Sequence, residues 1–448
     1  MTVTATTGRQ LDALAEHGSS SGISGFGEAE LRAIRADFPL LERTVHGDLP
    51  LVYLDSAATS QRPRTVLEAE EVYLTQQHAA VHRGAHALAE EATEAFESAR
   101  AAVAGFIGAQ PDELVWTSGA TDAINLVAGA ISDPAALADR DGDWPFSLHA
   151  GDEVVVTEME HHANLVPWQR ACARTGARLR WLPVRDDGRL DLSSIDQVIT
   201  PRAKVVAFTH ASNVLGTINP VRELADAARR VGALSLLDAC QSVPHLPVDV
   251  RELGIDLMAF SAHKMLAPTG IGALYGRREV LEGLPPVRTG GSMVETVTME
   301  WATYRSPPQR FEAGTQAVSQ AVAWQAAVEY LTHLGPARVA EHEQALTARL
   351  LDGLAGIEGI RVLGPLEVQD RVGAVSFAVE GVHPHDVGQV LDASGIAVRV
   401  GHHCAQPVHR RFGIGASTRA SVALYSTPAE VDAFLAALAG VRGFFGAR

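Results

Sequence analysis

Long apolar runs are missing from this sequence, and none approaches the ~20 residues that a membrane-spanning helix requires. The first residues, MTVTATTGRQLDALAEHG, also lack the basic region followed by an apolar stretch that a secretory signal contains. Both absences argue against a membrane-bound or secreted protein. We therefore expect a cytoplasmic protein with no membrane partner.

Cysteine and positive charge are also scarce. The three cysteines, Cys172, Cys240 and Cys404, are odd in number and widely spaced, which argues against a disulfide framework and favours a reducing compartment. No Cys-x-x-Cys pair indicates a closed zinc site, and we expect no bound metal. The formal net charge of −16 would repel phosphate-rich surfaces, so we expect no nucleic-acid partner and assign the charge to solubility.

Apolar residues, in contrast, make up 46% of the 448 residues, enough for a sizeable core and two or three domains. Residues 1–27 are rich in Ser, Gly, Thr and Ala and predict a disordered N-terminal tail. We expect an N-terminal segment and a large domain over residues 28–318. A small C-terminal domain that carries Cys404 is expected over residues 319–448.

The middle of the chain alternates between short apolar runs and stretches with helical spacing. The apolar runs are residues 114–117, 153–157, 204–210, 233–239, 257–262 and 271–276. Short buried strands separated by helices predict an open α/β sheet with both faces covered. Beyond residue 319, strands and helices mix in a pattern that predicts a smaller α+β unit.

Ligands bind beyond the C-terminal ends of the strands in such a sheet. Five of the expected strands are followed by polar residues, namely residues 118–121, residues 160–162, Asn213, Asp238 with Gln241, and residues 261–264. We therefore predict one shared site at this edge of the sheet.

Two charged residues follow apolar strands and so require an explanation. A lysine at a buried strand end is costly unless it is paired or neutral, and a Schiff base at Lys264 would remove the charge. An exposed loop lysine is the commoner alternative for Lys264 viewed alone. Asp238 ends an apolar strand and would suit the protonated nitrogen of a pyridine ring, or it caps a helix.

A second group of residues suits a phosphate and an aromatic ring. Residues 119–121, Gly-Ala-Thr, lie between a strand and a helix, where backbone N–H groups and a hydroxyl favour an anion or simply cap the helix. Ser261 and His263 could add contacts to the same phosphate. His161 could stack on a ring, which we favour over metal binding because His161 and His162 point to opposite sides of an extended segment.

Cys404 lies in a polar turn, Gly401-His402-His403-Cys404, unlike the other cysteines. An imidazolium beside it would stabilise the thiolate and favour nucleophilic attack, whereas a buried structural thiol is the alternative. Arg419 follows the glycine-rich stretch GIGAST and could grip a substrate carboxylate, or form a surface ion pair.

Several longer segments resemble one family in the family's own order. They are YLDSAATSQRP, AAVHRGAHALAEEAT, EMEHHANLVPWQ, THASNVLGTINP, DLMAFSAHKMLAPTGIGALYG, RFEAGT and AVRVGHHCAQP. From about Asp37 to the C-terminus the chain resembles the class V aminotransferase-like, fold-type I pyridoxal-phosphate enzymes, and among them the SufS-type, or group II, cysteine desulfurases. The resemblance implies a large domain with a mainly parallel seven-stranded sheet and a smaller α+β C-terminal domain.

The resemblance also implies roles for single residues. Lys264 matches the lysine that holds pyridoxal 5'-phosphate, and Cys404 matches the residue that becomes a persulfide while L-cysteine is converted to L-alanine. Asn213 and Arg419 match the carboxylate grip. Three residues match contacts to the cofactor ring: Asp238 at the pyridine nitrogen, Gln241 at the phenolic oxygen and His161 on the ring face. The residues that match phosphate contacts are Ala120, Thr121, Ser261, His263 and Thr315.

Two of the implied phosphate contacts, at Ala120 and Thr315, have further consequences. Ala120 stands where some relatives carry a hydroxyl residue, so the phosphate would rely more on Thr121. Thr315 matches a contact supplied by the other subunit, which implies a homodimer.

Transfer of the sulfur implies a further partner, a SufU- or SufE-like sulfur acceptor for iron–sulfur cluster assembly. His385 matches a histidine that engages the zinc of SufU-type acceptors, or it is an ordinary surface histidine. A selenocysteine lyase or another class V lyase is the alternative enzyme. A non-catalytic assembly subunit would lack Lys264 or Cys404, and both are present.

Overall fold

The computed structural model describes residues 25–134 and 144–446. Residues 1–24 of the predicted tail lie outside this range, whereas residues 25–27 lie within it. Phe26 is buried, with its ring 5.2 Å from the ring of His342 and 4.9 Å from the guanidinium of Arg338. The packed structure therefore includes the last three residues that we assigned to the tail.

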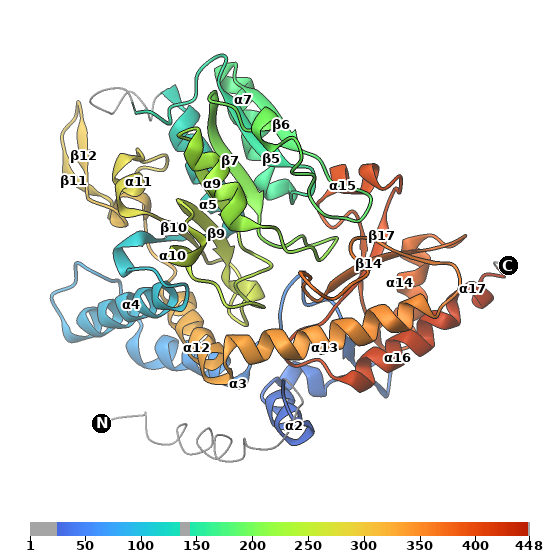
Figure 1. The fold of residues 1–448 in the computed structure, drawn as a ribbon. Helices are drawn as coiled ribbons and strands as arrows, with labels where there is room; N and C mark the ends of the chain where they lie inside the picture. Colours follow the sequence, from blue (N-terminus) through green and yellow to red (C-terminus); the bar gives the residue numbers. More distant parts are fainter. Residues whose placement is uncertain (1–24, 135–143, 447–448) are drawn as a thin grey trace.

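A seven-stranded sheet forms the centre of the larger part of the molecule (Figure 1). In spatial order its strands are β4 (Leu114–Thr117), β10 (Gly272–Gly276), β9 (Leu257–Ser261), β8 (Leu234–Asp238), β7 (Ala203–Thr209), β5 (Glu153–Thr157) and β6 (Arg178–Leu182). All pairs from β9 to β6 are parallel, and β10 runs antiparallel to β9 and β4. The expected α/β fold with a mainly parallel seven-stranded sheet is confirmed.

Successive side chains of each strand point to opposite faces of this sheet, and helices bury both faces. On one face, Val154 belongs to a core with α5 (Ala120–Ser132) and α7 (Val166–Thr175). On the other face, Val155 belongs to a core with α4 (Ala87–Phe106), α9 (Val221–Arg230) and α12 (Val318–Leu334). Burial on both faces explains why the central strands read as continuous apolar runs.

Of the seven strands in this sheet, β6 is the one that no apolar run in the sequence predicted. It lies at the edge of the sheet and has the sequence RLRWL, in which Leu182 is the buried residue and Trp181 is 56% exposed. Unlike β4, the buried strand at the other edge, β6 is largely exposed, so it does not carry the apolar run that located the other six strands of this sheet.

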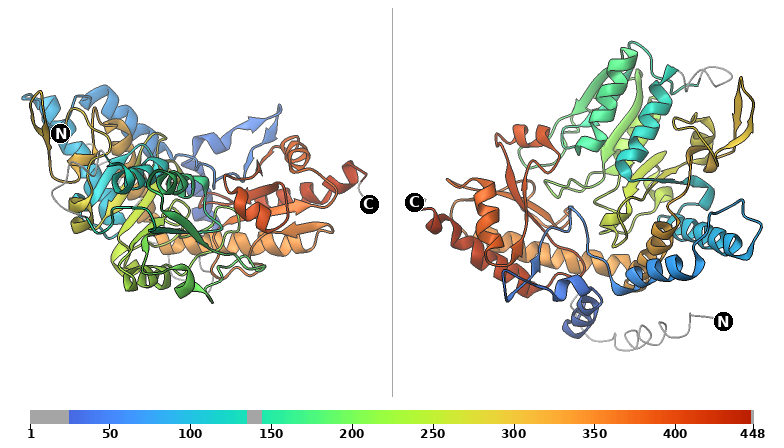
Figure 2. Two further views of the ribbon diagram at one scale, coloured as in Figure 1. Left: turned by 90° about the horizontal axis from the view of Figure 1, so that it is seen from above. Right: turned by 180° about the vertical axis from the view of Figure 1, so that it is seen from behind.

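A smaller antiparallel sheet lies beside the large one (Figure 2). Its order is β13 (Ile360–Val362), β14 (Ala374–Val379), β17 (Ser417–Ser421) and β16 (Arg399–Gly401). Helices α13 (Pro336–Ala355), α14 (Pro384–Asp392) and α16 (Pro428–Ala439) pack against it around Phe377 and Phe434. Strand β15 (Ile396–Ala397) pairs in parallel with β3 (Val52–Tyr53), so an N-terminal segment joins this part. The expected smaller α+β unit is confirmed.

The boundary between the two parts can be placed by packing. Trp324 of α12 lies in the core of the large sheet, whereas Leu346 of α13 lies in the core of the small sheet. Gly335, with φ +85°, separates the two helices. The boundary at residues 318 and 319 stays a prediction, and this packing leads us to propose Gly335 instead.

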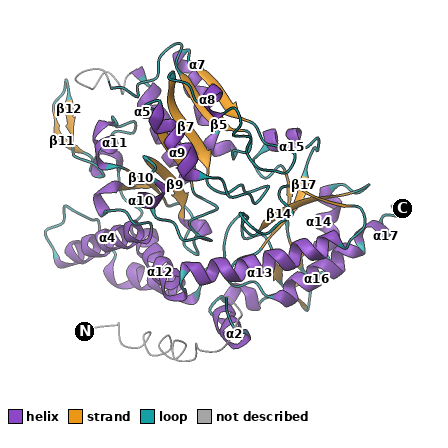
Figure 3. Cartoon of the chain, in the orientation of Figure 1, coloured by secondary structure: helices purple, strands orange, loops and turns teal. Residues whose placement is uncertain are grey.

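The remaining elements are short or lie at the periphery (Figure 3). They are α2 (Glu28–Ala36), β1 (Thr44–Val45), β2 (Leu49–Pro50), α3 (Arg64–Val72), α8 (Ile195–Val198), α10 (Val250–Leu253), α11 (Arg278–Gly283), β11 (Val294–Val297), β12 (Ala302–Tyr304), α15 (Gln406–Arg411) and α17 (Val441–Phe444). Within the part of the chain that the structure describes, every helix is too short or too polar to cross a membrane.

Candidate active site

A cavity of about 340 Å³ lies where strands β7, β8 and β9 end and where the turn after β16 meets them. Its wall includes every predicted catalytic, cofactor and substrate residue except Thr315, namely Ala120, Thr121, His161, Asn213, Asp238, Gln241, Ser261, His263, Lys264, Cys404 and Arg419. Lys264 from the large sheet and Cys404 from the smaller part therefore line one cavity. A larger cavity of about 830 Å³, between α4, α10 and α12, contains none of these residues.

Lys264 is placed at the cavity by the single turn η5 (Ala262–Lys264), which directly follows β9. The sequence contains two lysines, and the other one, Lys204, donates from Nζ to the carbonyl oxygen of Pro145 at 2.9 Å. Lys204 does not line the cavity. Lys264 is therefore the lysine of this chain that is positioned to form a Schiff base there.

Asp238 is the last residue of β8 and is 4% exposed. Its Oδ1 accepts a hydrogen bond from the backbone N–H of Cys240 at 3.0 Å, which resembles the capping role that we weighed as the alternative. Asp238 also lines the cavity, so capping does not remove the carboxylate from the site. A buried carboxylate at this position favours a cationic ligand group.

His161 lies at the start of the short turn η4 (His162–Asn164), where its Nδ1 accepts a hydrogen bond from Ala163 N–H at 3.1 Å. Burial and the nearby charge of Lys264 lower the pKa of His161 to about 4, so the ring is neutral near pH 7. A neutral imidazole can stack on a flat ring. No group of three or more His, Cys, Asp or Glu side chains in residues 25–134 and 144–446 could hold a metal ion.

One end of the cavity is formed by the N-terminus of α5. Gly119 precedes the helix with φ +152°, and Ala120 N–H donates to Ser261 Oγ at 2.9 Å. A side chain at Gly272 would bring its Cβ to 2.4 Å from the Gly119 Cα, so glycine at Gly272 keeps this strand-to-helix turn close to β10. Burial lowers the pKa of His263 to about 4. The helix N-terminus and neutral polar side chains therefore suit an anion here.

Arg399 and Arg419, which also line the cavity, share Asp55 as their ion partner. Arg399 pairs with Asp55 through Nη2–Oδ2 at 2.6 Å, and Arg419 Nη2 lies 3.5 Å from Asp55 Oδ1. Arg419 is 2% exposed and donates from Nη1 to the carbonyl oxygen of Asn213 at 3.0 Å, but its buried Nε has no hydrogen-bond partner among the described residues. Arg419 therefore retains a donor for a carboxylate ligand.

The sequence did not assign a role to Asp55, Arg399 or His162. Asp55 and Arg399 lie in segments that we quoted, but only the fold brings them to Arg419. His162 holds the Cys404 turn, because its backbone N–H donates to the Cys404 carbonyl oxygen at 2.6 Å and its Nε2 accepts from Gln406 N–H at 3.1 Å. The sequence signal that could have identified His162 is its position next to His161.

The three cysteines differ in exposure. Cys172 is buried, and burial raises the pKa of its thiol to about 11. Burial and the charge of Asp238 raise the pKa of Cys240 well above its ordinary value. Cys404 is exposed and lines the cavity. Cys172 and Cys240 therefore stay as inert thiols, while Cys404 is accessible to a ligand.

The expectation of an imidazolium beside Cys404 is wrong for three of the neighbouring histidines. Burial lowers the pKa of His403 to about 2 and that of His161 to about 4, and burial together with the charge of His402 lowers the pKa of His162. Positive charge comes from Arg419 instead. Burial lowers the pKa of Arg419 to about 10, and the nearby Cys404 is one of the groups that oppose this shift.

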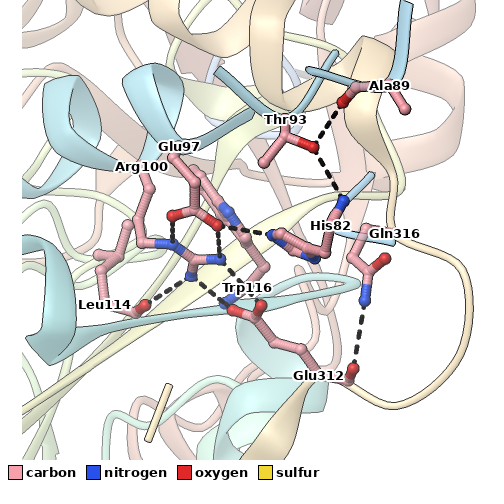
Figure 4. A network of polar contacts seen from close by, with 9 residues as sticks. All are labelled: His82, Ala89, Thr93, Glu97, Arg100, Leu114, Trp116, Glu312 and Gln316. Atoms are coloured by element: carbon pink, nitrogen blue, oxygen red, sulfur yellow. Dashed lines mark hydrogen bonds and ion pairs between the residues drawn. The ribbon is translucent and has the colours of Figure 1, made fainter. Parts of the chain in front are cut away.

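Two predicted residues lie outside the cavity. Thr315 is exposed, three residues after Glu312, which is anchored by Arg100 (Figure 4). His385 is exposed near the start of α14, where its backbone N–H donates to His383 Nδ1 at 3.2 Å. Their roles at a second subunit and at an acceptor stay predictions.

Comparison with known proteins places this cavity in context. Residues 52–434 match the family described as aminotransferase class-V. A probable cysteine desulfurase 2 of Mycobacterium leprae is 54% identical over 93% of this chain and 98% of its own length. A probable cysteine desulfurase of Streptomyces coelicolor is 52% identical over 94% of this chain and 99% of its own length.

Solved structures show the same likeness. The apo structure of a cysteine desulfurase from Thermococcus onnurineus has a TM-score of 0.85 at 37% identity and covers 95% of this chain and 100% of the solved chain. The cysteine desulfurase CsdA of Escherichia coli has a TM-score of 0.83 at 35% identity, covering 92% of this chain and 98% of its own. The chain therefore belongs to the class-V aminotransferase family and, within it, to the cysteine desulfurases of the SufS and CsdA type.

Proposed function

We propose that this enzyme takes the sulfur of free L-cysteine onto Cys404 as a persulfide, releases L-alanine and supplies the sulfur for iron–sulfur cluster assembly. The observation that carries the proposal is the meeting of Lys264, Arg419 and Cys404 in one cavity of about 340 Å³. The three residues come from different strands and turns, and together they offer an amine, a carboxylate grip and an accessible thiol.

Pyridoxal 5'-phosphate, the cofactor of this family, fits the residues of the large-sheet side. The phosphate would lie at the N-terminus of α5, beside Thr121, Ser261 and His263, where glycine at Gly272 lets the strand-to-helix turn approach β10 closely. Asp238 would pair with the pyridine nitrogen. Gln241, Lys264 and the His161 ring would hold its phenolic oxygen, its aldehyde carbon and its face, respectively. When bound, the cofactor supplies an electron sink for the bonds at the substrate α-carbon.

The residues of the chain bind and orient the substrate. Arg419 and Asn213 would bind the carboxylate of cysteine, with the unpartnered Nε of Arg419 as one donor. Lys264 Nζ is the group in the cavity that would move the proton at the substrate α-carbon, since His161 is neutral and poorly basic.

Cys404 would then remove the sulfur. Its thiolate attacks the substrate sulfur, so that an S–S bond forms as the C–S bond breaks. The electrons of the C–S bond stay with the carbon, which takes up a proton and becomes the methyl group of alanine. The Arg419 guanidinium is the nearby positive charge that favours the attacking thiolate.

The test replaces the proposed nucleophile and compares it with a second cysteine of the same cavity. The Cys404→Ala variant is expected to bind the cofactor normally and to form no persulfide, because Cys404 belongs to the turn after β16 and not to the strand ends that carry Asp238 and Lys264. Its rate of alanine formation should fall by at least about a hundredfold. Cys240→Ala serves as the matched control and should keep its activity, since a raised pKa keeps its thiol protonated although Cys240 also lines the cavity. Full turnover by Cys404→Ala would refute the proposal.

The enzyme would work as a cytoplasmic homodimer, a state in which Thr315 of one subunit reaches the phosphate site of the other. This assignment is supported by the exposure of Thr315 and by its absence from the cavity wall of its own chain. A reducing compartment also keeps Cys404 available between turnovers.

The persulfide would pass to a SufU- or SufE-like acceptor protein, and His385 is the candidate contact to the zinc of a SufU-type acceptor. The His385→Ala variant is expected to bind a purified zinc-loaded SufU-type acceptor about tenfold more weakly, because one metal contact is lost. Affinity can be measured by titration calorimetry, with the exposed His333 replaced by alanine as the control. If the acceptor binds wild type and His385→Ala with equal affinity and stimulates the activity of both equally, the proposed contact is refuted.

A further inference from the structure

The turn that carries Cys404 has an unusual backbone. His403 and Cys404 adopt φ values of +49° and +55°, so two consecutive residues with side chains are left-handed. L-amino acids disfavour this conformation, and such residues persist when the surrounding structure holds them. The position of the thiol therefore depends on the groups that hold this turn.

Three consecutive carbonyl groups of the turn have hydrogen-bond partners, two from distant segments and the third from α15, which directly follows the turn. Asn213 Nδ2 donates to the His403 carbonyl oxygen at 2.7 Å, and His162 N–H donates to that of Cys404 at 2.6 Å. His409 Nδ1 lies 2.9 Å from the carbonyl oxygen of Ala405. The third contact requires a particular form of the His409 ring.

The hydrogen-bond partners of His409 and His403 determine which nitrogen of each ring carries a proton. A carbonyl oxygen only accepts, so His409 Nδ1 carries a proton. Burial lowers the pKa of His409 although the Ala405 carbonyl acts against this shift, so the ring is neutral near pH 7 and its Nε2 accepts. The hydroxyl of Ser417 therefore donates to His409 Nε2 at 3.0 Å and accepts from His403 Nε2 at 2.9 Å. One buried hydroxyl thus fixes the tautomer and the orientation of both histidines.

The strand register explains why Ser417 can do this. Ser417 is the first residue of β17 and pairs with Gly401 of β16, the residue at which the Cys404 turn begins. Arg419 lies two residues further along β17 and so points to the same face of the strand. One face of one strand therefore carries both the proposed carboxylate grip and the anchor of the turn with the thiol.

We propose that Ser417 and His409 are positioning residues, which hold Cys404 at the distance and angle that its attack on the substrate sulfur needs. The proposal rests on the proposed function of Cys404 as the nucleophile. Neither residue lines the cavity, so both act through the turn and not on the substrate itself.

The first test is the Ser417→Ala variant of the cofactor-loaded enzyme. Its kcat for alanine formation from cysteine should fall by about 10- to 100-fold, because a small displacement of a nucleophile has effects of this size. The KM for cysteine and the cofactor absorbance should stay within about twofold of wild type. Ser417→Thr keeps the hydroxyl and should recover most of the lost kcat.

A structural readout accompanies the kinetics. Hydrogen exchange of the backbone amides in residues 402–408 should become about fivefold faster in Ser417→Ala, because the loss of hydrogen bonds loosens the turn. Exchange in β7, β8 and β9 should stay unchanged. If Ser417→Ala does not fold, His409→Leu provides the same test, with the buried His342 replaced by leucine as the control, since His342 contacts Ser426 and not the turn.

The outcomes separate this inference from the proposed function. If Cys404→Ala is inactive while folded Ser417→Ala or His409→Leu shows wild-type kcat and wild-type exchange, the positioning role is refuted and the proposed function stands. If Cys404→Ala keeps full turnover, the proposed function itself fails. A fall in kcat at constant KM, together with faster exchange in the turn, supports the positioning role.

Discussion

The Lys264→Ala variant is expected to lose its covalent link to pyridoxal 5'-phosphate and to form alanine about 10²- to 10⁴-fold more slowly than wild type. Lys264 is the lysine that lines the cavity, so its loss would remove both the proposed attachment point and the group proposed to move the α-proton. The neutral His161 ring, with a pKa near 4, is a poor substitute as a base near pH 7.

Borohydride reduction followed by peptide mass analysis tests this result together with steady-state assays. Wild type should yield the cofactor bound to the peptide that contains Lys264, and Lys264→Ala should yield no labelled peptide. The Lys204→Ala variant replaces the other lysine of the chain, which donates to Pro145 outside the cavity, and should behave as wild type. A labelled Lys204 peptide, or normal turnover by Lys264→Ala, would contradict the assignment.

The second large effect is expected on stability, at the buried ion pair between Arg100 and Glu312 (Figure 4). Arg100 donates from Nη1 and Nη2 to Glu312 at 2.6 and 2.9 Å, and Glu312 also accepts from Trp116 N–H at 2.8 Å. Although burial alone would lower the pKa of Arg100, Glu312 and Glu97 raise it above its ordinary value. Arg100 therefore keeps its charge, and both side chains of the pair are almost completely buried.

The Glu312→Gln variant should therefore lower the free energy of unfolding by about 3–5 kcal/mol, because it leaves a buried guanidinium that Glu97 alone compensates. Denaturant-induced unfolding measures this change. Asp226→Asn removes one partner of an exposed pair with Arg229 and should cost no more than about 1 kcal/mol. Similar losses for the two variants would show that burial of the Arg100–Glu312 pair has no special effect.

Much of the fold could be predicted because the central strands are buried on both faces. Such strands appear in the sequence as continuous apolar runs, as in residues 153–157 and 257–262, whereas the half-exposed edge strand β6 leaves no such run. The antiparallel direction of β10 goes with a connection from β9, residues 262–271, that contains no crossover α-helix, and no apolar pattern encodes this direction.

The sequence predicts those site residues that lie at the ends of strands of the large sheet. Asp238 and Lys264 lie at neighbouring ends of β8 and β9, and the parallel topology brings them together. The contacts of Ser417 depend on the register between β16 and β17, and those of Asp55 on pairing between distant segments, neither of which one sequence reveals. Burial lowers the pKa of His403 to about 2, a shift that the sequence does not reveal, so the expected imidazolium is wrong for this histidine. The rarity of lysine was a usable signal, since the sequence contains only Lys204 and Lys264.

The account depends on sulfur moving from cysteine to Cys404 within one cavity. The most direct measurement is a single turnover of the cofactor-loaded enzyme with cysteine, in the absence of reductant and acceptor, followed by mass analysis of its peptides. We predict one extra sulfur atom on the peptide that contains Cys404, and one alanine for each modified site. Alanine release without this modification, or extra sulfur on Cys172 or Cys240 instead, would contradict the account.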